Sequence, residues 1–274
     1  MPPPHHTPLQ AALLEVRPAR GRRDEAMARR FEPHGVGCKA HARARTLLRR
    51  LVAPPPAARA SGDAGGNVAV RSALLVPEGA GASADASSLA AWAGCLGAPL
   101  GDLDYVRFVS VADLLSDGGG ASEDARSRAL AERFVEAKAM RRSMLILDDI
   151  DLLLAAGSGA PAACLSPVLT GALRSLLKEP LDSQGGAAAS ELAAGNPDDA
   201  DAPTSASSAP RSPPPPALII LATASDAAAA SALATAFDRI IKVPLLHTAE
   251  EAADALRSSP ALALLEVPSL RDSG

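Results

Sequence analysis

Met144-Leu145-Ile146-Leu147-Asp148-Asp149 is the stretch that decides the fold: four consecutive large apolar residues followed by two carboxylates. A β-strand that is buried on both faces has this continuous apolar character, because neither face meets water. Strands of this kind belong to parallel sheets that carry helices on both sides. The stretch therefore predicts the central strand of an α/β domain.

Outward from this strand, short apolar runs alternate with segments of helical periodicity. Strands are predicted over residues 73–76, 106–109, 144–147, 218–221 and 240–245, and helices over 87–96, 124–140, 168–178, 227–236 and 250–256. This alternation is typical of a parallel sheet flanked by helices. Ligands of such sheets bind at the carboxyl ends of the strands, so we expect any site to lie in the loops there.

The two carboxylates after the central strand have the form of a Walker-B motif. In that motif the first carboxylate, here Asp148, holds Mg²⁺, and the second, here Asp149, orients the attacking water. Both are therefore candidate catalytic residues, and Asp148 is also a candidate magnesium ligand. The alternative is a structural strand whose end happens to be acidic.

The loop after the first strand consists of small residues and precedes a helix, as a phosphate-binding loop does. Small residues let backbone N–H groups approach phosphates, and a helix N-terminus favours an anion. The candidate nucleotide-binding residues here are Gly79, Gly81, Ser83, Ser87 and Ser88, with Ser87 also a candidate magnesium ligand. The full pattern G-x-x-x-x-G-K-[ST] is absent, because Ala86 stands at the lysine position and Asp85 adds a negative charge. The loop is also compatible with an ordinary glycine- and alanine-rich turn.

A third polar position follows the strand predicted over residues 218–221. Thr223 is a candidate nucleotide-binding residue, because a hydroxyl at the end of this strand can contact the γ-phosphate. Threonine and serine are also common in any turn after a strand. The order of loop, acidic strand end and hydroxyl predicts a parallel sheet of the AAA+ P-loop NTPase type, flanked by helices.

These motifs and their surroundings resemble the second ATPase domain of the vesicle-fusing ATPases, the N-ethylmaleimide-sensitive fusion protein family. The resemblance covers residues 8–256 and is closest at residues 236–244, Ala-Phe-Asp-Arg-Ile-Ile-Lys-Val-Pro, where the family has Ala/Cys-Phe-x-x-x-Ile-x-Val-Pro. The P-loop lysine of the family is missing. Ala160-Pro161-Ala162 stands where the family has Gly-Pro-Arg, so that arginine is missing too.

The resemblance implies a cytoplasmic protein, peripheral to the Golgi and transport vesicles, with only indirect membrane contact. It implies a homo-hexamer that uses ATP and Mg²⁺ to disassemble SNARE complexes through an adaptor protein, in vesicle fusion and protein transport. In this family the second domain mainly binds ATP to hold the hexamer together, so we expect nucleotide binding and assembly more than catalysis. The alternatives are a pseudo-ATPase interaction module and a fragment without ATP binding.

The resemblance and the composition together give the expected domain organisation. Residues 1–52 are predicted to be the tail of a preceding ATPase domain and inter-domain linker helices, 53–67 a flexible linker, 68–246 the α/β domain with a disordered insertion at 181–216, and 247–274 the start of the truncated lid. The net charge of −4, with both signs interspersed, argues against a nucleic-acid partner, which would need a basic face. The three distant cysteines lack the spacing of a metal site or disulfide framework, which fits a reducing compartment.

Overall fold

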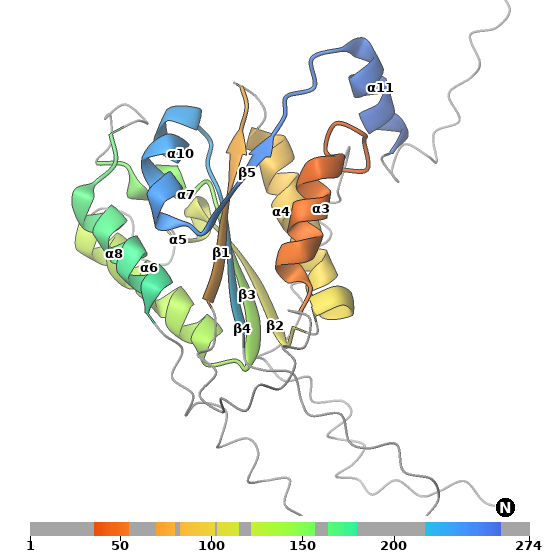
Figure 1. The fold of residues 1–274 in the computed structure, drawn as a ribbon. Coiled ribbons are helices and arrows are strands. Elements are labelled where there is room, and N and C mark those ends of the chain that lie inside the picture. The colour runs from red at the N-terminus through yellow and green to blue at the C-terminus, as the bar shows by residue number, and fades with distance from the viewer. Residues whose placement is uncertain are drawn as a thin grey trace, which may run out of the picture.

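A computed structural model of the chain describes residues 36–54, 70–79, 83–101, 103–114, 122–156, 164–179 and 217–258. The strands are β1 (Val70–Pro77), β2 (Tyr105–Ser110), β3 (Arg142–Asp148), β4 (Ala217–Thr223) and β5 (Arg239–Val243). The helices are α3 (Ala42–Val52), α4 (Ser83–Gly101), α5 (Val111–Leu114), α6 (Glu123–Lys138), α7 (Ile150–Leu154), α8 (Pro167–Lys178), α10 (Ala227–Leu233) and α11 (Ala249–Arg257), with a 3₁₀ turn η3 (Ala234–Ala236) after α10. Strands and helices thus alternate along the chain (Figure 1).

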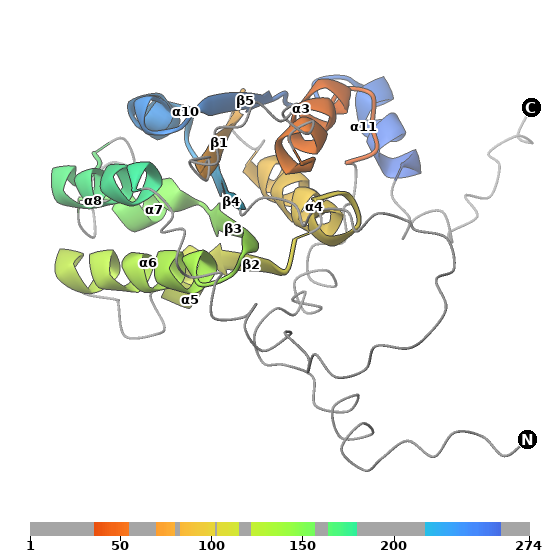
Figure 2. The same ribbon diagram turned by 60° about the horizontal axis from the view of Figure 1, so that its bottom comes forward.

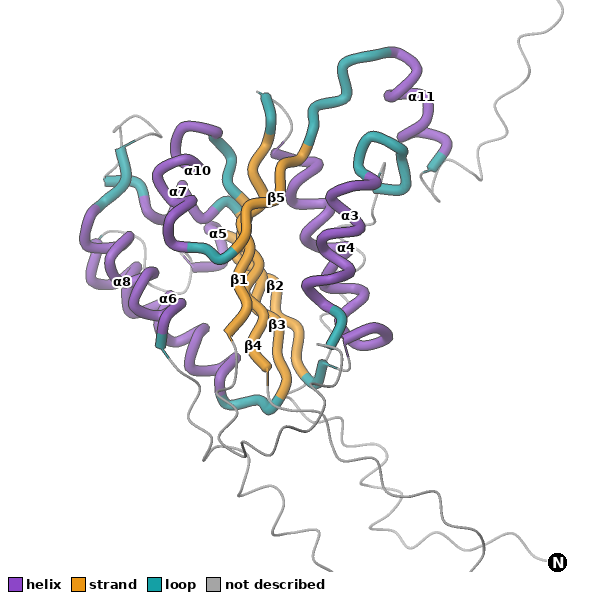
Figure 3. Tube along the Cα trace, viewed as in Figure 1, coloured by secondary structure: helices purple, strands orange, loops and turns teal. Residues whose placement is uncertain are grey.

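The strands lie together in one sheet (Figure 3). All of its pairs are parallel, and the order of the strands is β2-β3-β4-β1-β5. In its centre, Met144 of β3 pairs with Ile219 of β4, and Ala222 of β4 pairs with Leu74 of β1. Every residue of β3 and β4 is buried, as expected for strands covered on both faces. The edge strand β5 instead exposes Arg239, Ile240 and Lys242.

Helices cover both faces of the sheet, and the direction of each crossover explains which face each helix takes. The connection through α4 runs from β1 to the β2 edge, whereas the later connections all step toward the β5 edge. Right-handed crossovers in opposite directions place their helices on opposite faces. Accordingly, α3 and α4 lie on one face, and α6, α7, α8 and α10 lie on the other (Figures 1 and 2).

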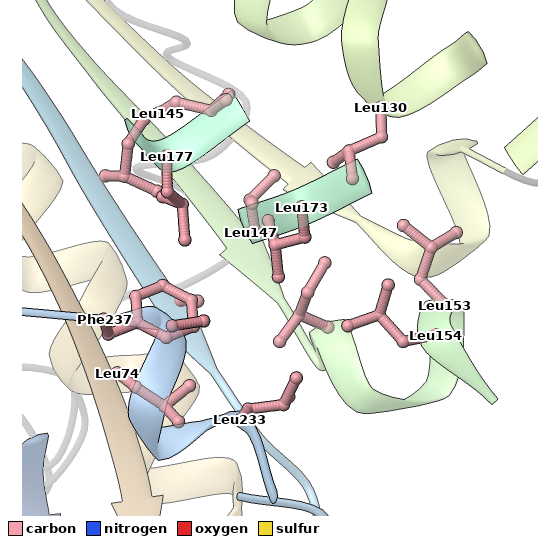
Figure 4. Close-up of a cluster of buried hydrophobic side chains, with 14 of the residues drawn as sticks. Leu74, Leu130, Leu145, Leu147, Leu153, Leu154, Leu173, Leu177, Leu233 and Phe237 are labelled. Atoms are coloured by element: carbon pink, nitrogen blue, oxygen red, sulfur yellow. The ribbon is translucent and has the colours of Figure 1, made fainter. Parts of the chain in front are cut away.

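Two hydrophobic cores result, one on each face, because successive side chains of a strand point to opposite faces. The core under α3 and α4 takes these sheet residues: Ala73, Leu75, Met144, Ile146, Ile219 and Leu221. The core under α6, α7, α8 and α10 takes their neighbours: Leu74, Leu145, Leu147, Leu218 and Ile220 (Figure 4). Each large side chain buried in this way contributes about 1.5–3 kcal/mol. Together the cores fix the carboxyl ends of β1, β3 and β4 beside one another.

The strands and helices predicted from residue 73 onward are all confirmed, with shifted boundaries. Helix α4 begins at Ser83 rather than at residue 87. The carboxylate of Asp85 in its first turn interacts favourably with the positive end of the helix dipole. Strand β5 ends at Val243 because Pro244 has no N–H group for the ladder. The helix predicted over residues 227–236 tightens into η3 for its last turn.

Several predicted features lie wholly or partly outside the described residues. These are the segment 1–35, most of the linker at 53–67, the insertion at 181–216, Ala160-Pro161-Ala162, and the lid beyond residue 258. Within the described part of residues 1–52, α3 packs on α4 and buries Leu48 and Leu51 in the shared core. No helix in the described ranges combines the length and apolar character needed to cross a membrane.

Candidate functional site

The carboxyl ends of β1 and β4 form the switch point of the sheet. These neighbouring strands lead to helices on opposite faces, β1 to α4 and β4 to α10. In open parallel sheets, ligands bind in the crevice beside such a point, because the two loops diverge there. Four of the described candidate residues lie at this end of the sheet. Ser87 is in the first turns of α4, Asp148 and Thr223 are the last residues of β3 and β4, and Asp149 directly follows β3.

Asp148, the last residue of β3, is the centre of the site. Its Oδ1 atom accepts hydrogen bonds from the Ser87 hydroxyl of α4, at 2.6 Å, and from the Thr223 hydroxyl of β4, at 2.7 Å. Both bonds are charge-assisted and buried, and bonds of this kind contribute about 1.5–3 kcal/mol each. Residues 61 and 75 positions away along the chain are thus brought to one carboxylate oxygen.

Thr223 connects the two carboxylates of the predicted Walker-B motif. Its hydroxyl donates to Asp148 and accepts the backbone N–H of Asp149 at 2.8 Å. The side chain is fully buried, so both of these bonds replace water. The hydroxyl of Thr223 therefore fixes the position of Asp149 relative to Asp148.

Asp149 lies directly after β3 in a left-handed conformation, with φ 51° and ψ 47°. Aspartate tolerates this region better than most residues, and such backbone conformations occur preferentially at functional sites. Burial, and then the nearby charges of Asp148 and Asp151, raise the pKa of Asp149 to about 6. Its Oδ1 atom is buried without a hydrogen-bond partner. A carboxylate held in this way favours a cation beside it.

Asp151 forms a second buried link between the same two strand ends. It is 1% exposed and accepts three hydrogen bonds, from Ser225 N at 2.9 Å, Ser225 Oγ at 2.6 Å and Asp226 N at 3.2 Å. Asp226 in turn caps α10 by accepting from the backbone N–H groups of Ala228 and Ala229. The start of α7 is thereby tied to the loop after β4. The sequence prediction did not include Asp151, although a third carboxylate two positions after Asp149 was the available signal.

The oxygen atoms at this edge suit a hard divalent cation. Magnesium prefers carboxylate and hydroxyl oxygens and keeps several of its own waters, so it needs only one or two protein ligands. Asp148 and Ser87 provide such oxygens side by side, and Asp149 adds an unpartnered carboxylate oxygen. The donor set therefore fits Mg²⁺.

The predicted phosphate loop offers less to an anion. Ala86 is fully buried in the core under α3, so position 86 contributes no charge to the site. Asp85 lies in the first turn of α4, and burial raises the pKa of its carboxyl, with nearby His41 acting in the opposite direction. Ser88 turns its hydroxyl back to the carbonyl of Ala84, at 2.9 Å, and does not reach Asp148.

Among the glycines and small residues of this loop, the structure describes Gly79. A Cβ atom added there would lie 3.3 Å from Leu245, so the loop after β1 approaches the segment after β5 closely. Gly81 and the side chain of Ser83 lie outside the described residues.

Comparison with known proteins leaves the site to be interpreted from its own geometry. No protein-family model matches the chain, and no curated protein matches it at a significant level. The fold is shown by the structure alone: a five-stranded, all-parallel sheet flanked by helices.

Proposed function

We propose that this chain is an AAA+-type domain that binds Mg²⁺-ATP at the carboxyl edge of its sheet and hydrolyses it slowly. The single observation that supports this most strongly is the convergence of Ser87 and Thr223 on Oδ1 of Asp148. A helix after the first strand, the acidic end of the third strand and the hydroxyl end of the fourth strand thus meet at one point. These are the positions at which the sequence motifs place the magnesium, phosphate and γ-phosphate contacts.

In this site the residues of the chain have distinct parts. Ser87 and Asp148 would hold Mg²⁺, whose charge offsets that of the β- and γ-phosphates. The single hydroxyl of Thr223 holds the side chain of Asp148 and the backbone of Asp149 in fixed positions relative to each other. Asp149, with a pKa of about 6, is mostly ionised at neutral pH and can accept a proton from a water molecule.

Slow hydrolysis follows from the phosphate side of the site. Phosphoryl transfer depends on positive charge that stabilises the transferring group, and the P-loop lysine normally provides part of it. Ala86 provides none, and Asp85 places a carboxylate in the first turn of α4. The site is therefore better suited to hold a metal-bound nucleotide than to accelerate its cleavage.

The assembly role rests on sequence resemblance to the vesicle-fusing ATPases. On this proposal the domain stabilises an ATP-dependent homo-hexamer that acts through an adaptor on SNARE complexes at Golgi and transport vesicles. The closest stretch of that resemblance, residues 236–244, covers the last residue of η3, all of β5 and Pro244. Sedimentation of the purified chain with and without Mg²⁺-ATP tests this role, and an unchanged mass in both conditions would contradict it.

Calorimetric titration of the purified chain with Mg²⁺-ATP tests the binding proposal. Ser87→Ala removes a magnesium ligand, so we expect its affinity to fall at least about tenfold. Ser88→Ala is the matched control, because the neighbouring hydroxyl bonds only to its own helix, and its affinity should be unchanged. No binding by the natural chain, or equal losses in both variants, would overturn the proposal.

A second candidate is an interaction module that keeps the sheet but does not bind ATP. The observation that favours it is the charge at the start of α4, where Asp85 is present and the lysine is absent. The two candidates differ in one outcome: the interaction module would assemble with its partners at the same affinity whether or not nucleotide is present.

A further inference from the structure

His41 is a buried histidine whose side chain lacks hydrogen bonds. It precedes α3, is 1% exposed, and neither of its ring nitrogens has a hydrogen-bond partner. A buried polar atom without a partner costs about 1–3 kcal/mol, so its retention calls for a reason. The ring nitrogen Nε2 lies 3.8 Å from Oδ2 of Asp85, in the first turn of α4.

Among the described residues, Asp85 has a carboxylate within ion-pair distance of His41. Ionisable groups of this region also include Cys38, Lys39 and Arg45 on the same segment and Asp254 on α11. Arg45 donates to the carbonyl of Cys38, and Asp254 accepts the backbone N–H of Lys39 at 2.8 Å. Helix α11 therefore packs beside the segment before α3, and Figure 2 shows the two side by side.

We infer that His41 is a positioning residue for the proposed nucleotide site: its buried ring lies beside Asp85 and, when protonated, offsets the negative charge at the start of α4. This inference rests on the proposed function. The missing lysine and the added aspartate are two departures at one place, and a protonated ring behind Asp85 would compensate for part of both. His41 reaches Asp85 from the position just before α3, so it acts on the phosphates only through that carboxylate.

The pairing has a consequence that depends on the charge of the ligand. An unscreened carboxylate at Asp85 repels each added phosphate, whereas it does not repel an uncharged nucleoside. Removing His41 should therefore weaken Mg²⁺-ATP more than Mg²⁺-ADP and leave adenosine unchanged.

A double-mutant cycle with His41→Gln and Asp85→Asn tests the inference in the full chain. We expect His41→Gln to weaken Mg²⁺-ATP binding about fivefold when Asp85 is present and to have no effect in the Asp85→Asn variant. Asp124→Asn is the matched control, because Asp124 occupies the first turn of α6, where its side chain is exposed. Equal losses with and without Asp85, or an equal loss for adenosine, would show a merely structural histidine and overturn the inference while the proposed function stands.

The same four proteins separate failure of the inference from failure of the proposed function. If the natural chain does not bind Mg²⁺-ATP, the proposed function fails, and the role of His41 in nucleotide binding fails with it. Whether His41 and Asp85 interact is then tested by the melting temperatures of the four proteins without nucleotide. If His41→Gln lowers the melting temperature by about 2–4 °C more in the chain with Asp85 than in the Asp85→Asn variant, the interaction of His41 with Asp85 is supported. Equal decreases in the two backgrounds would overturn it.

Discussion

The two halves of the proposed site differ in how completely they are built. The half at the ends of β3 and β4 is closely bonded: Asp148, Thr223 and Asp151 join the strand ends, and Ser87 reaches them from α4. The half after β1 has no lysine, carries Asp85, and turns Ser88 away from the site. On the proposed function, the first half (the metal half) could hold Mg²⁺ by itself, whereas the second (the phosphate half) lacks the positive charge that phosphates favour. We therefore expect metal binding and phosphate binding to be separable in this fold.

The largest effect is expected at the centre of the metal half. Asp148→Ala removes the proposed magnesium ligand and leaves the Ser87 and Thr223 hydroxyls without their acceptor. We expect the Mg²⁺-ATP affinity to fall about 100-fold and the free energy of unfolding to fall by about 1–3 kcal/mol. Calorimetry and urea denaturation measure the two changes. Unchanged affinity would show that the two halves do not differ in the way described.

The next effect concerns the link that supports the metal half without contacting ligand. Asp151→Asn places an amide group against the N–H groups of Ser225 and Asp226, which donate to the carboxylate in the natural chain. We expect a loss of about 1.5–3 kcal/mol in the free energy of unfolding by urea denaturation. Asp124→Asn, at an exposed helix start, serves as the control for the same chemical change. Similar stability of the two variants would contradict a structural role of Asp151.

Asp149 makes the stability of the metal half depend on pH. Its pKa of about 6 lies above the ordinary value, so the folded state favours the protonated form. The stabilisation is complete below about pH 4 and is lost as the pH rises through about 6. We expect Asp149→Asn to raise the free energy of unfolding by about 1–2 kcal/mol at pH 8, with allowance for partial solvent screening, and to have little effect at pH 4. Urea denaturation at both values measures this, and an equal effect at both would contradict it.

The smallest effect is expected in the phosphate half. Asp85→Asn removes a like charge from the first turn of α4, where phosphates would bind. Because His41 already offsets part of this charge, we expect the Mg²⁺-ATP affinity to rise only about threefold. Calorimetry detects a change of this size. A decrease in affinity would show that Asp85 contributes to binding, and would reverse the comparison between the halves.

The part of the fold that could be predicted from the sequence is the part with local patterns. The apolar runs of β3 and β4 indicated buried parallel strands, and the carboxylates after Leu147 indicated the site. The links between distant segments had no such pattern: Asp151 and Ser225 are separated by 74 positions, and His41 reaches Asp85 from another helix. The burial of Ala86 also depends on α3 packing on α4, which residue spacing near the loop does not show.

Measuring ATP affinity with saturating Mg²⁺ and again with the metal chelated tests the central claim most directly. If Mg²⁺ held by the metal half carries most of the nucleotide affinity, ATP should bind with Mg²⁺ and lose at least about 100-fold in affinity without it, a difference of about 2.7 kcal/mol. Equal affinity in both conditions would contradict the account, because phosphates would then be held by groups other than the metal site around Asp148.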